Sequence, residues 1–134
     1  MKDPYAHYGN NDFNRRFFVA AIKSESDPSD EVIVGTIAVQ EPESLSPFNP
    51  GTDAEIRRVS IVPAVRGQGI ARMLYNRVET FVRQHESLKR IVLSTSSLQH
   101  KALMMYKHYG FRELARKRVV GGVLEIVFLA KSLR

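Results

Sequence analysis

The chain has 134 residues, of which 43% are hydrophobic, and a formal net charge of +6 at pH 7. A chain of this length can bury a core of its own, so we expect a single domain over residues 1–134. The absence of cysteine excludes disulfides, thiolate metal sites and a cysteine nucleophile. The four histidines lack zinc-site spacing, so no metal is expected. Since no apolar run reaches the roughly 20 residues of a membrane span and no signal peptide is recognisable, we expect a cytoplasmic protein without a membrane span.

The first part of the chain predicts strands. Residues 1–15 are rich in turn formers and lack periodicity, which indicates a loop. Two runs rich in β-branched and aromatic residues, 16–23 and 31–40, flank polar breakers and predict a hairpin. After an irregular excursion over residues 41–53, which holds three prolines, residues 54–62 predict a third strand.

A helix is predicted directly after the third strand, where residues 63–74 read PAVRGQGIARML. Apolar residues recur from there at three- and four-residue spacing, with polar residues between them, as in a helix that buries one face. The residues of this apolar face are Ile70, Met73, Leu74, Val78, Phe81 and Val82. The sequence therefore places two glycines against the start of an amphipathic helix.

The last part of the chain predicts a strand, a helix and a hairpin. Residues 90–95 are apolar without alternation, which is typical of a strand buried on both faces. A second helix over 99–108 is ended by Gly110. Two further strands are expected at 112–118 and 123–130, across a turn at Gly121–Gly122. The predicted order is β-β-β-α-β-α-β-β, which defines an α/β fold with a mixed sheet.

The glycines of residues 63–74 lie inside a predicted β-α-β unit that joins two parallel strands. They follow the carboxyl end of a strand and precede a helix N-terminus, a place that binds phosphate through backbone N–H groups and the helix dipole. The simpler alternative is a tight strand-to-helix connection. Two other glycine-rich phosphate-binding motifs do not fit. A dinucleotide-binding fingerprint would need a third glycine where Arg72 stands, and the GK[ST] ending of a nucleoside-triphosphate-binding loop is absent.

Two motifs resemble those of the GNAT superfamily of acyl-coenzyme A-dependent N-acetyltransferases. In IVPAVRGQGIARML, Arg66, Gly69 and Ala71 match the family's pyrophosphate-binding pattern [QR]-x-x-G-x-[GA]. Downstream, ALMMYKHYGF over residues 102–111 is similar to the family ending A-x-x-x-Y-x-x-x-G-F. Two motifs in this order, separated by a predicted strand, are far more specific than either alone.

The resemblance implies that acetyl-coenzyme A is the co-substrate. The family's donor site would use the third strand, where backbone groups pair with the pantetheine arm, and the glycine loop, which cradles the pyrophosphate. The residues implied are Val59, Ser60, Ile61, Arg66, Gly67, Gln68, Gly69, Ile70, Ala71 and Arg72. Gln99 stands where the family commonly has an asparagine, and would also contact coenzyme A.

The resemblance also implies two catalytic residues. The Tyr106 hydroxyl would act as general acid for the departing thiolate, whereas a purely structural reading makes Tyr106 a core aromatic. Glu55 occupies the third-strand position where many family members carry the base that deprotonates the amine. The alternative for Glu55 is a surface salt bridge with Arg57 or Arg58. Glu125, on a tail strand, is the reserve candidate for the base.

The expected function is direct transfer of an acetyl group to a primary amine of a small molecule or protein. Family members usually begin with a strand and two helices, and this chain has about 15 residues there. We expect either that this part is truncated or that it is reduced, with residues 1–15 a loop or a remnant of the N-terminal segment. A non-catalytic coenzyme A-binding or scaffold domain of the same fold therefore stays open, as does a homodimer. A basic nucleic-acid-binding module is the weaker alternative, because the basic residues are scattered, and no nucleic-acid partner is expected.

Overall fold

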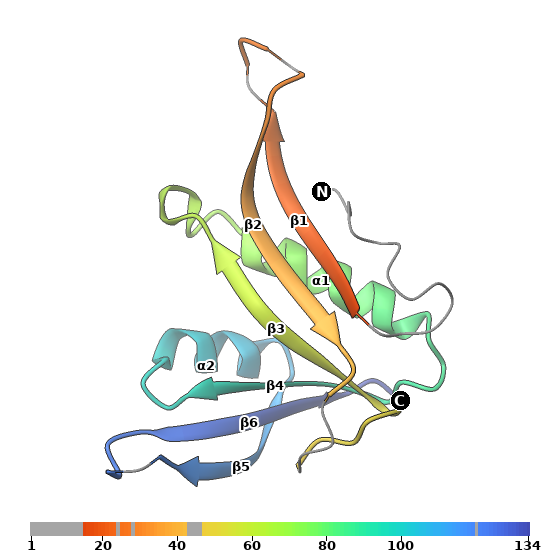
Figure 1. The fold of residues 1–134 in the computed structure, drawn as a ribbon, viewed down its shortest axis with the longest axis vertical. Coiled ribbons are helices and arrows are strands. Elements are labelled where there is room, and N and C mark those ends of the chain that lie inside the picture. The colour runs from red at the N-terminus through yellow and green to blue at the C-terminus, as the bar shows by residue number, and fades with distance from the viewer. Residues whose placement is uncertain (1–14, 24, 28, 43–46, 120) are drawn as a thin grey trace. The chain divides into compact units, whose positions relative to one another are not determined.

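The computed structural model describes residues 15–23, 25–27, 29–42, 47–119 and 121–134. Their order along the chain, β-β-β-α-β-α-β-β with one added 3₁₀ turn, confirms the prediction (Figure 1). The elements are β1 (Arg15–Lys23), β2 (Glu31–Gln40), β3 (Asp53–Ile61), η1 (Pro63–Val65), α1 (Ile70–Arg83), β4 (Arg90–Ser96), α2 (His100–His108), β5 (Arg112–Arg118) and β6 (Glu125–Ser132).

Element boundaries differ from the predicted ones by one or two residues. Arg15 belongs to β1 rather than to the preceding loop, and Gln99 is the N-cap of α2 rather than its first residue. Strand β6 begins and ends two residues later than predicted, because its register with β4 continues to the pair Arg90–Ser132. The predicted loop over residues 1–14 lies outside the described residues.

The strands form a six-stranded mixed sheet in the order β1-β2-β3-β4-β6-β5. The ladder between β3 and β4 is parallel and joins residues 53–55 to 90–92, which confirms the β-α-β unit. The chain divides into two compact units that share β3: unit 1 holds residues 1–41 and 56–85, and unit 2 holds residues 42–55 and 86–134. None of the helices in the described part of the chain is long and apolar enough to cross a membrane.

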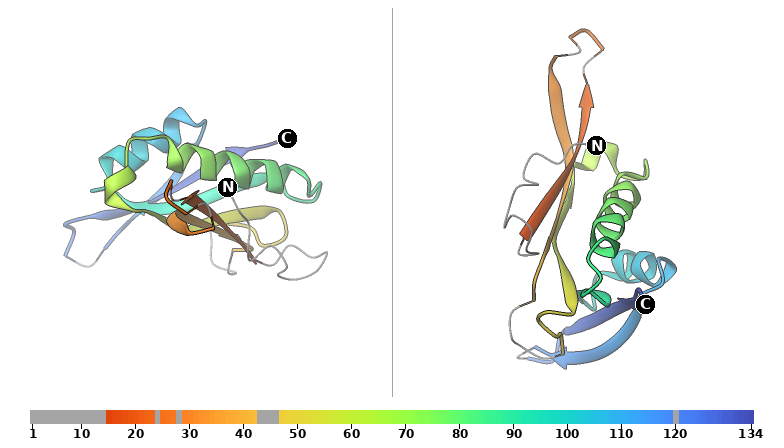
Figure 2. Two further views of the ribbon diagram at one scale, coloured as in Figure 1. Left: turned by 90° about the horizontal axis from the view of Figure 1, so that it is seen from above. Right: turned by 90° about the vertical axis from the view of Figure 1, so that its right-hand side faces the viewer.

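In unit 1, helix α1 packs on one face of strands β1 and β2 (Figure 2). Its buried residues are Leu74, Tyr75, Val78, Phe81 and Val82. The ring of Phe81 meets that of Phe18 from β1 edge to face, with centroids 5.7 Å apart. The prediction that Met73 belongs to this face is wrong, since Met73 is 48% exposed. Tyr75 lies in the core instead, and its hydroxyl donates to Glu79 Oε1 at 2.7 Å, which satisfies its polar end.

Gly35 in β2 allows the start of α1 to approach the sheet. A Cβ built on Gly35 would lie 2.9 Å from Cδ1 of Ile61, 3.0 Å from Cγ2 of Ile70 and 3.1 Å from Cδ1 of Leu74. These distances are shorter than ordinary carbon–carbon contact, so a side chain at position 35 would force these neighbouring side chains to move. The absence of a side chain at Gly35 thus allows close packing between β2, Ile61 and the start of α1.

In unit 2, strand β4 is the centre of the core. Its residues Ile91, Val92 and Leu93 are all buried, which confirms that β4 is covered on both faces. The antiparallel partner β6 pairs with it over seven residues and in turn pairs with β5 at the edge of the sheet. On one face Val92 and Ala130 pack with Phe48, whose ring meets that of Phe128 at 5.6 Å.

A buried ion pair joins the first residues of β3 and β4. Asp53 is 1% exposed and accepts from Arg90 through Nε at 2.8 Å and Nη2 at 2.7 Å. The Asn49 backbone N–H donates to the same carboxylate at 2.8 Å. The carboxylate beside the guanidinium raises the pKa of Arg90 further above its ordinary value. The ion pair thus links β3 and β4 at the end of the sheet where their parallel ladder begins.

We expect Asp53→Ala to lower the free energy of unfolding by about 3 kcal/mol, because it leaves the largely desolvated Arg90 without its partner. Glu113→Ala is the matched control. It breaks another two-bond arginine–carboxylate contact, with Arg116, that is exposed to solvent and should cost less than about 1 kcal/mol. Urea unfolding of the two variants measures both values, and equal losses would contradict the role of burial.

Candidate active site

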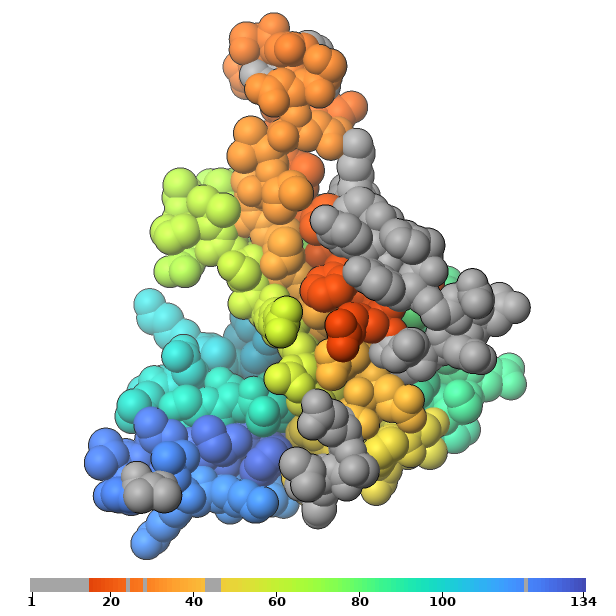
Figure 3. All heavy atoms as spheres, viewed as in Figure 1, coloured from red at the N-terminus to blue at the C-terminus, as the bar shows by residue number. Residues whose placement is uncertain are grey.

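Both glycines of the loop between η1 and α1 have a left-handed backbone conformation. Gly67 has φ +83° and Gly69, the N-cap of α1, has φ +80°, a region that side chains rarely allow. A Cβ built on either glycine would meet no atom within 4 Å, so neither is needed for packing inside the protein. The glycines leave an open approach to the backbone of a segment that lies at the surface of unit 1 (Figure 3).

The first turn of α1 favours an anion. The first bond within this helix runs from the N–H of Met73 to the carbonyl of Gly69 at 3.0 Å, so the N–H groups before Met73 have no acceptor inside the helix. No acidic residue lies in this turn to compensate the positive end of the helix dipole. Arg66 and Arg72 are exposed on either side of the glycines. Phosphate oxygens are the ligands that such a turn binds.

Strand β3 is interrupted by an unusual residue. Arg58 has φ +54°, and it is the one non-glycine residue with positive φ in the described part of the chain. Around it the burial alternation stops, so that residues 57–60 are all exposed. A left-handed arginine costs on the order of 1 kcal/mol, and such strain is commonly found at functional sites. Nothing in the sequence signals it, because arginine has no preference for this conformation.

The predicted pantetheine-binding residues follow this irregularity. Val59 and Ser60 are exposed and Ile61 is partly buried. The end of the segment is held to β2, because the Val62 N–H donates to the Val34 carbonyl at 2.8 Å. Unit 1 thus brings together the end of β3, the glycine loop and the first turn of α1.

Tyr106 lies on the buried face of α2 in unit 2. Its side chain is 7% exposed, and its ring contacts those of Phe111 and Tyr109, with centroids 5.5 Å and 6.3 Å away. Burial raises the pKa of Tyr106 to about 12, with a smaller contribution from the charge interaction with Tyr109. The hydroxyl therefore keeps its proton at neutral pH and can donate a hydrogen bond.

The Gly-Phe ending of the second motif has a structural cause. Gly110, with φ +104°, follows the C-cap of α2, and its N–H donates to the Lys107 carbonyl at 3.0 Å. The Phe111 N–H donates to the Tyr106 carbonyl at 3.0 Å, which completes a Schellman motif. This helix stop folds the Phe111 ring back against that of Tyr106. The motif therefore holds the tyrosine in place as well as ending the helix.

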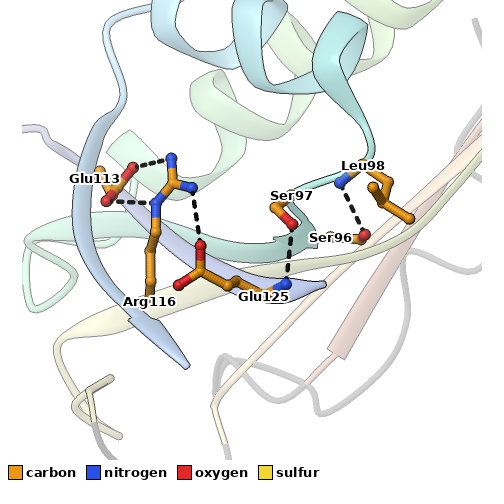
Figure 4. A network of polar contacts seen from close by, with 6 residues as sticks. All are labelled: Ser96, Ser97, Leu98, Glu113, Arg116 and Glu125. Carbon is orange, nitrogen blue, oxygen red and sulfur yellow. Dashed lines mark hydrogen bonds and ion pairs between the residues drawn. The ribbon is translucent and has the colours of Figure 1, made fainter. Parts of the chain in front are cut away.

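Gln99 caps α2 with its backbone and not with its side chain. Its carbonyl accepts from the Leu103 N–H at 2.9 Å, whereas its side chain makes no cap hydrogen bond and is exposed. The preceding turn is fixed by two serines: Ser96 Oγ accepts from the Leu98 N–H at 3.1 Å, and Ser97 Oγ accepts from the Glu125 N–H at 2.9 Å (Figure 4). The Gln99 side-chain amide is thus exposed at the N-terminus of α2, next to a turn that is held by hydrogen bonds.

The two acidic candidates differ in their surroundings. Glu55 is partly buried at the end of the parallel ladder, in register with Val92. Glu125 lies 3.5 Å from Arg116 Nη1, and Arg116 also holds Glu113 through two hydrogen bonds (Figure 4). The contact with Arg116 restricts the movement of the Glu125 carboxylate. Glu55, Gln99, Tyr106 and Glu125 all belong to unit 2.

No cluster of three or more histidines or acidic residues that could hold a metal ion occurs among the described residues.

Comparison with known proteins agrees with these features. The sequence profile described as "Acetyltransferase (GNAT) family" matches residues 2–111, which belong to both units. The chain is therefore a member of the GNAT acetyltransferase family. It is 32% identical over 99 residues to N-acetyltransferase 8B of Mus musculus, a match that covers 72% of this chain and 41% of the length of that protein.

Solved structures share the fold. Arabidopsis thaliana NAA60, in complex with a bisubstrate analogue, has a TM-score of 0.74 and 20% identity over 92% of this chain and 79% of its own. The NatC complex bound to Gag peptide and CoA has a TM-score of 0.69 and 20% identity over 88% of this chain and 71% of its own. At this level of identity the likeness establishes the GNAT fold, which the sequence predicted.

The pKa of Tyr106 predicts a late ionisation. The difference in tyrosinate absorbance between the protein and Tyr106→Phe should titrate near pH 12, and a midpoint near the ordinary value of about 10 would contradict the burial. Because the unfolded chain loses this proton first, stability should fall between pH 10 and pH 12 by up to about 3 kcal/mol. Tyr106→Phe should lack this part of the pH dependence, as measured by urea unfolding.

Proposed function

We propose that residues 1–134 act as one N-acetyltransferase domain that transfers acetyl from acetyl-coenzyme A to a primary amine. The observation that carries this proposal is the glycine loop before α1, whose positive φ angles and open approach suit a bound pyrophosphate. Membership of the GNAT family supplies the chemistry that such a donor site serves.

The donor site would be formed by backbone groups. The N–H groups around Gly67 and Gly69 and in the first turn of α1 would bind the pyrophosphate, and the charges of Arg66 and Arg72 would add attraction for it. Residues 59–61 would pair with the pantetheine arm as an added strand. The irregularity at Arg58 supports this role, because it turns the backbone out of the regular pleat just before these residues. The Gln99 amide would contribute one further contact.

The Tyr106 hydroxyl would face the sulfur that departs with coenzyme A. The pKa of about 12 lies well above that of an ordinary thiol, near 8.5, so complete proton transfer from Tyr106 to the thiolate would be uphill by about 5 kcal/mol. We therefore refine the general-acid role to that of a hydrogen-bond donor, which stabilises negative charge on sulfur while Tyr106 keeps its proton. A proton from the attacking nitrogen can neutralise the thiolate after the C–S bond breaks.

The acceptor amine must lose a proton before it attacks. For a lysine-like amine this costs about 4–5 kcal/mol at pH 7, so a carboxylate near the amine accelerates the reaction. We assign this role to Glu55, directly or through water, because it occupies the third-strand position where many family members carry their base and is partly buried at the end of the parallel ladder. Glu55 accepts one proton from the ammonium group before attack. The nitrogen then bonds to the acetyl carbon, the C–S bond breaks, and a second nitrogen proton goes to the thiolate, which leaves the amide, the free thiol of coenzyme A and one proton on Glu55 that passes to solvent. The acceptor class comprises primary amines of small molecules or proteins.

Gly69→Asp should abolish binding of acetyl-coenzyme A in isothermal titration calorimetry, because it brings a side chain and a negative charge to the proposed pyrophosphate site. Gly51→Asp is the matched control, since Gly51 also has positive φ (+93°) with nothing within 4 Å of an added Cβ. It should bind as the unmodified protein does. Equal binding by the two variants would show that the loop is not the phosphate site.

Tyr106→Phe should lower kcat by about 10- to 100-fold and leave the affinity for acetyl-coenzyme A within about threefold, because a hydrogen bond to developing charge counts mainly in the transition state. Release of free thiol, measured over a panel of peptides, polyamines and small amines, reports kcat. An unchanged kcat in Tyr106→Phe would indicate that Tyr106 has only a structural role. Cofactor binding without thiol release from any amine would favour the non-catalytic alternative.

A further inference from the structure

Unit 2 contains a cavity that the proposed reaction does not use. Its volume is about 440 Å³, within the range of small-molecule sites. It lies where β4 and β5 begin and β6 ends, since Arg90 and Arg112 are the first residues of their strands and Ser132 is the last of its own. The lining residues are Arg90, Gly110, Arg112, Leu114, Ala130 and Ser132.

The cavity is remote from Gln99 and the turn before α2. These lie beyond the other end of β4, a strand of seven residues that spans about 20 Å. None of the cavity residues belongs to the proposed donor or catalytic set. A ligand in this cavity would therefore occupy a second site.

The cavity carries an uncompensated positive charge. Arg90 is balanced by Asp53, to which it donates through Nε and Nη2. Arg112 is exposed, and no carboxylate lies within ion-pair distance of it in the described part of the chain. The Lys131 stem lies against Gly110 at the border of the cavity.

The other lining groups limit the kind of anion. Ala130 is buried and belongs to the apolar cluster with Val92 and Phe48, and Leu114 is 40% exposed. Ser132 and Arg112 line the same cavity; the Ser132 hydroxyl can donate a hydrogen bond, and the planar fork of the Arg112 guanidinium matches a carboxylate. One uncompensated guanidinium beside apolar carbon suits a monoanion with a short hydrocarbon part better than a dianionic phosphate.

We propose that this cavity binds a small aliphatic carboxylate, with its carboxylate on Arg112 and Ser132 and its hydrocarbon part on Leu114 and Ala130. Butyrate is a suitable probe, because it combines one carboxylate with a three-carbon chain. The matched probes are 1-butanol, which keeps a similar chain without the charge, and inorganic phosphate, which keeps an anionic charge without the chain.

The test is a titration followed by ¹H–¹⁵N correlation spectra of the full chain. Butyrate should shift the amide signals of Gly110, Arg112 and Ser132 saturably in the millimolar range, and both matched probes should bind at least about fivefold more weakly. Arg112→Gln should weaken butyrate binding about tenfold, because charge-assisted hydrogen bonds are strong. Arg118→Gln, which removes an exposed arginine of the same strand outside the cavity, should leave the affinity within about twofold.

Several results would overturn the proposal. One is the absence of saturable shifts at these amides up to about 100 mM butyrate, a concentration at which even weak sites fill. An equal loss of butyrate affinity in Arg112→Gln and Arg118→Gln would indicate general electrostatic attraction. Equal affinities for butyrate and 1-butanol would indicate a purely apolar pocket. Tighter binding of phosphate than of butyrate would indicate a phosphate site. If Arg112→Gln does not fold, Leu114→Glu replaces it: a negative charge at this exposed position should abolish binding, and retained binding would contradict the site.

Discussion

The ion pair between Asp53 and Arg90 is the constraint on which the register of β3 and β4 in unit 2 depends. It joins the first residues of the two parallel strands and, with the Asn49 N–H, satisfies the buried carboxylate. From this point β3 leads to Glu55, and β4 leads to the turn before Gln99 and α2. A slip of one residue in either strand would separate the charges and turn each side chain to the opposite face. The ion pair thus contributes to the register of the two strands as much as to the stability of the fold.

The glycines of this protein affect its backbone for three different physical reasons. Gly35 matters because of its neighbours: three side chains occupy the space that its Cβ would fill. Gly67 and Gly69 matter because of their φ angles and face open space, so they shape the loop without contributing to packing, as the proposed donor site requires. Gly110 combines a positive φ with the hydrogen bonds of a helix stop. One residue type therefore supports close packing, ligand approach and chain reversal.

The elements and the parallel ladder could be predicted because they depend on local patterns, namely periodicity, breakers and glycines next to helix ends. Other features depend on partners that are distant in the sequence. Asp53 seemed to belong to an irregular excursion, since nothing near it signals Arg90, which is 37 residues away. The packing around Gly35 involves Ile61 and Ile70, and the strain at Arg58 has no compositional signal. Tyr106 could be placed by its motif, but its raised pKa comes from tertiary burial.

The burial of Tyr106 also affects what enzyme kinetics can reveal. A phenol that holds its proton until about pH 12 is in one protonation state across the whole range in which acetyl transfer is ordinarily measured. It therefore contributes no inflection to a pH–rate profile over that range. Any inflection that appears must come from the acceptor amine or from the carboxylate that deprotonates it. If the proposed acetyl transfer takes place, the shape of the pH–rate profile would therefore report on the amine and the carboxylate and not on Tyr106.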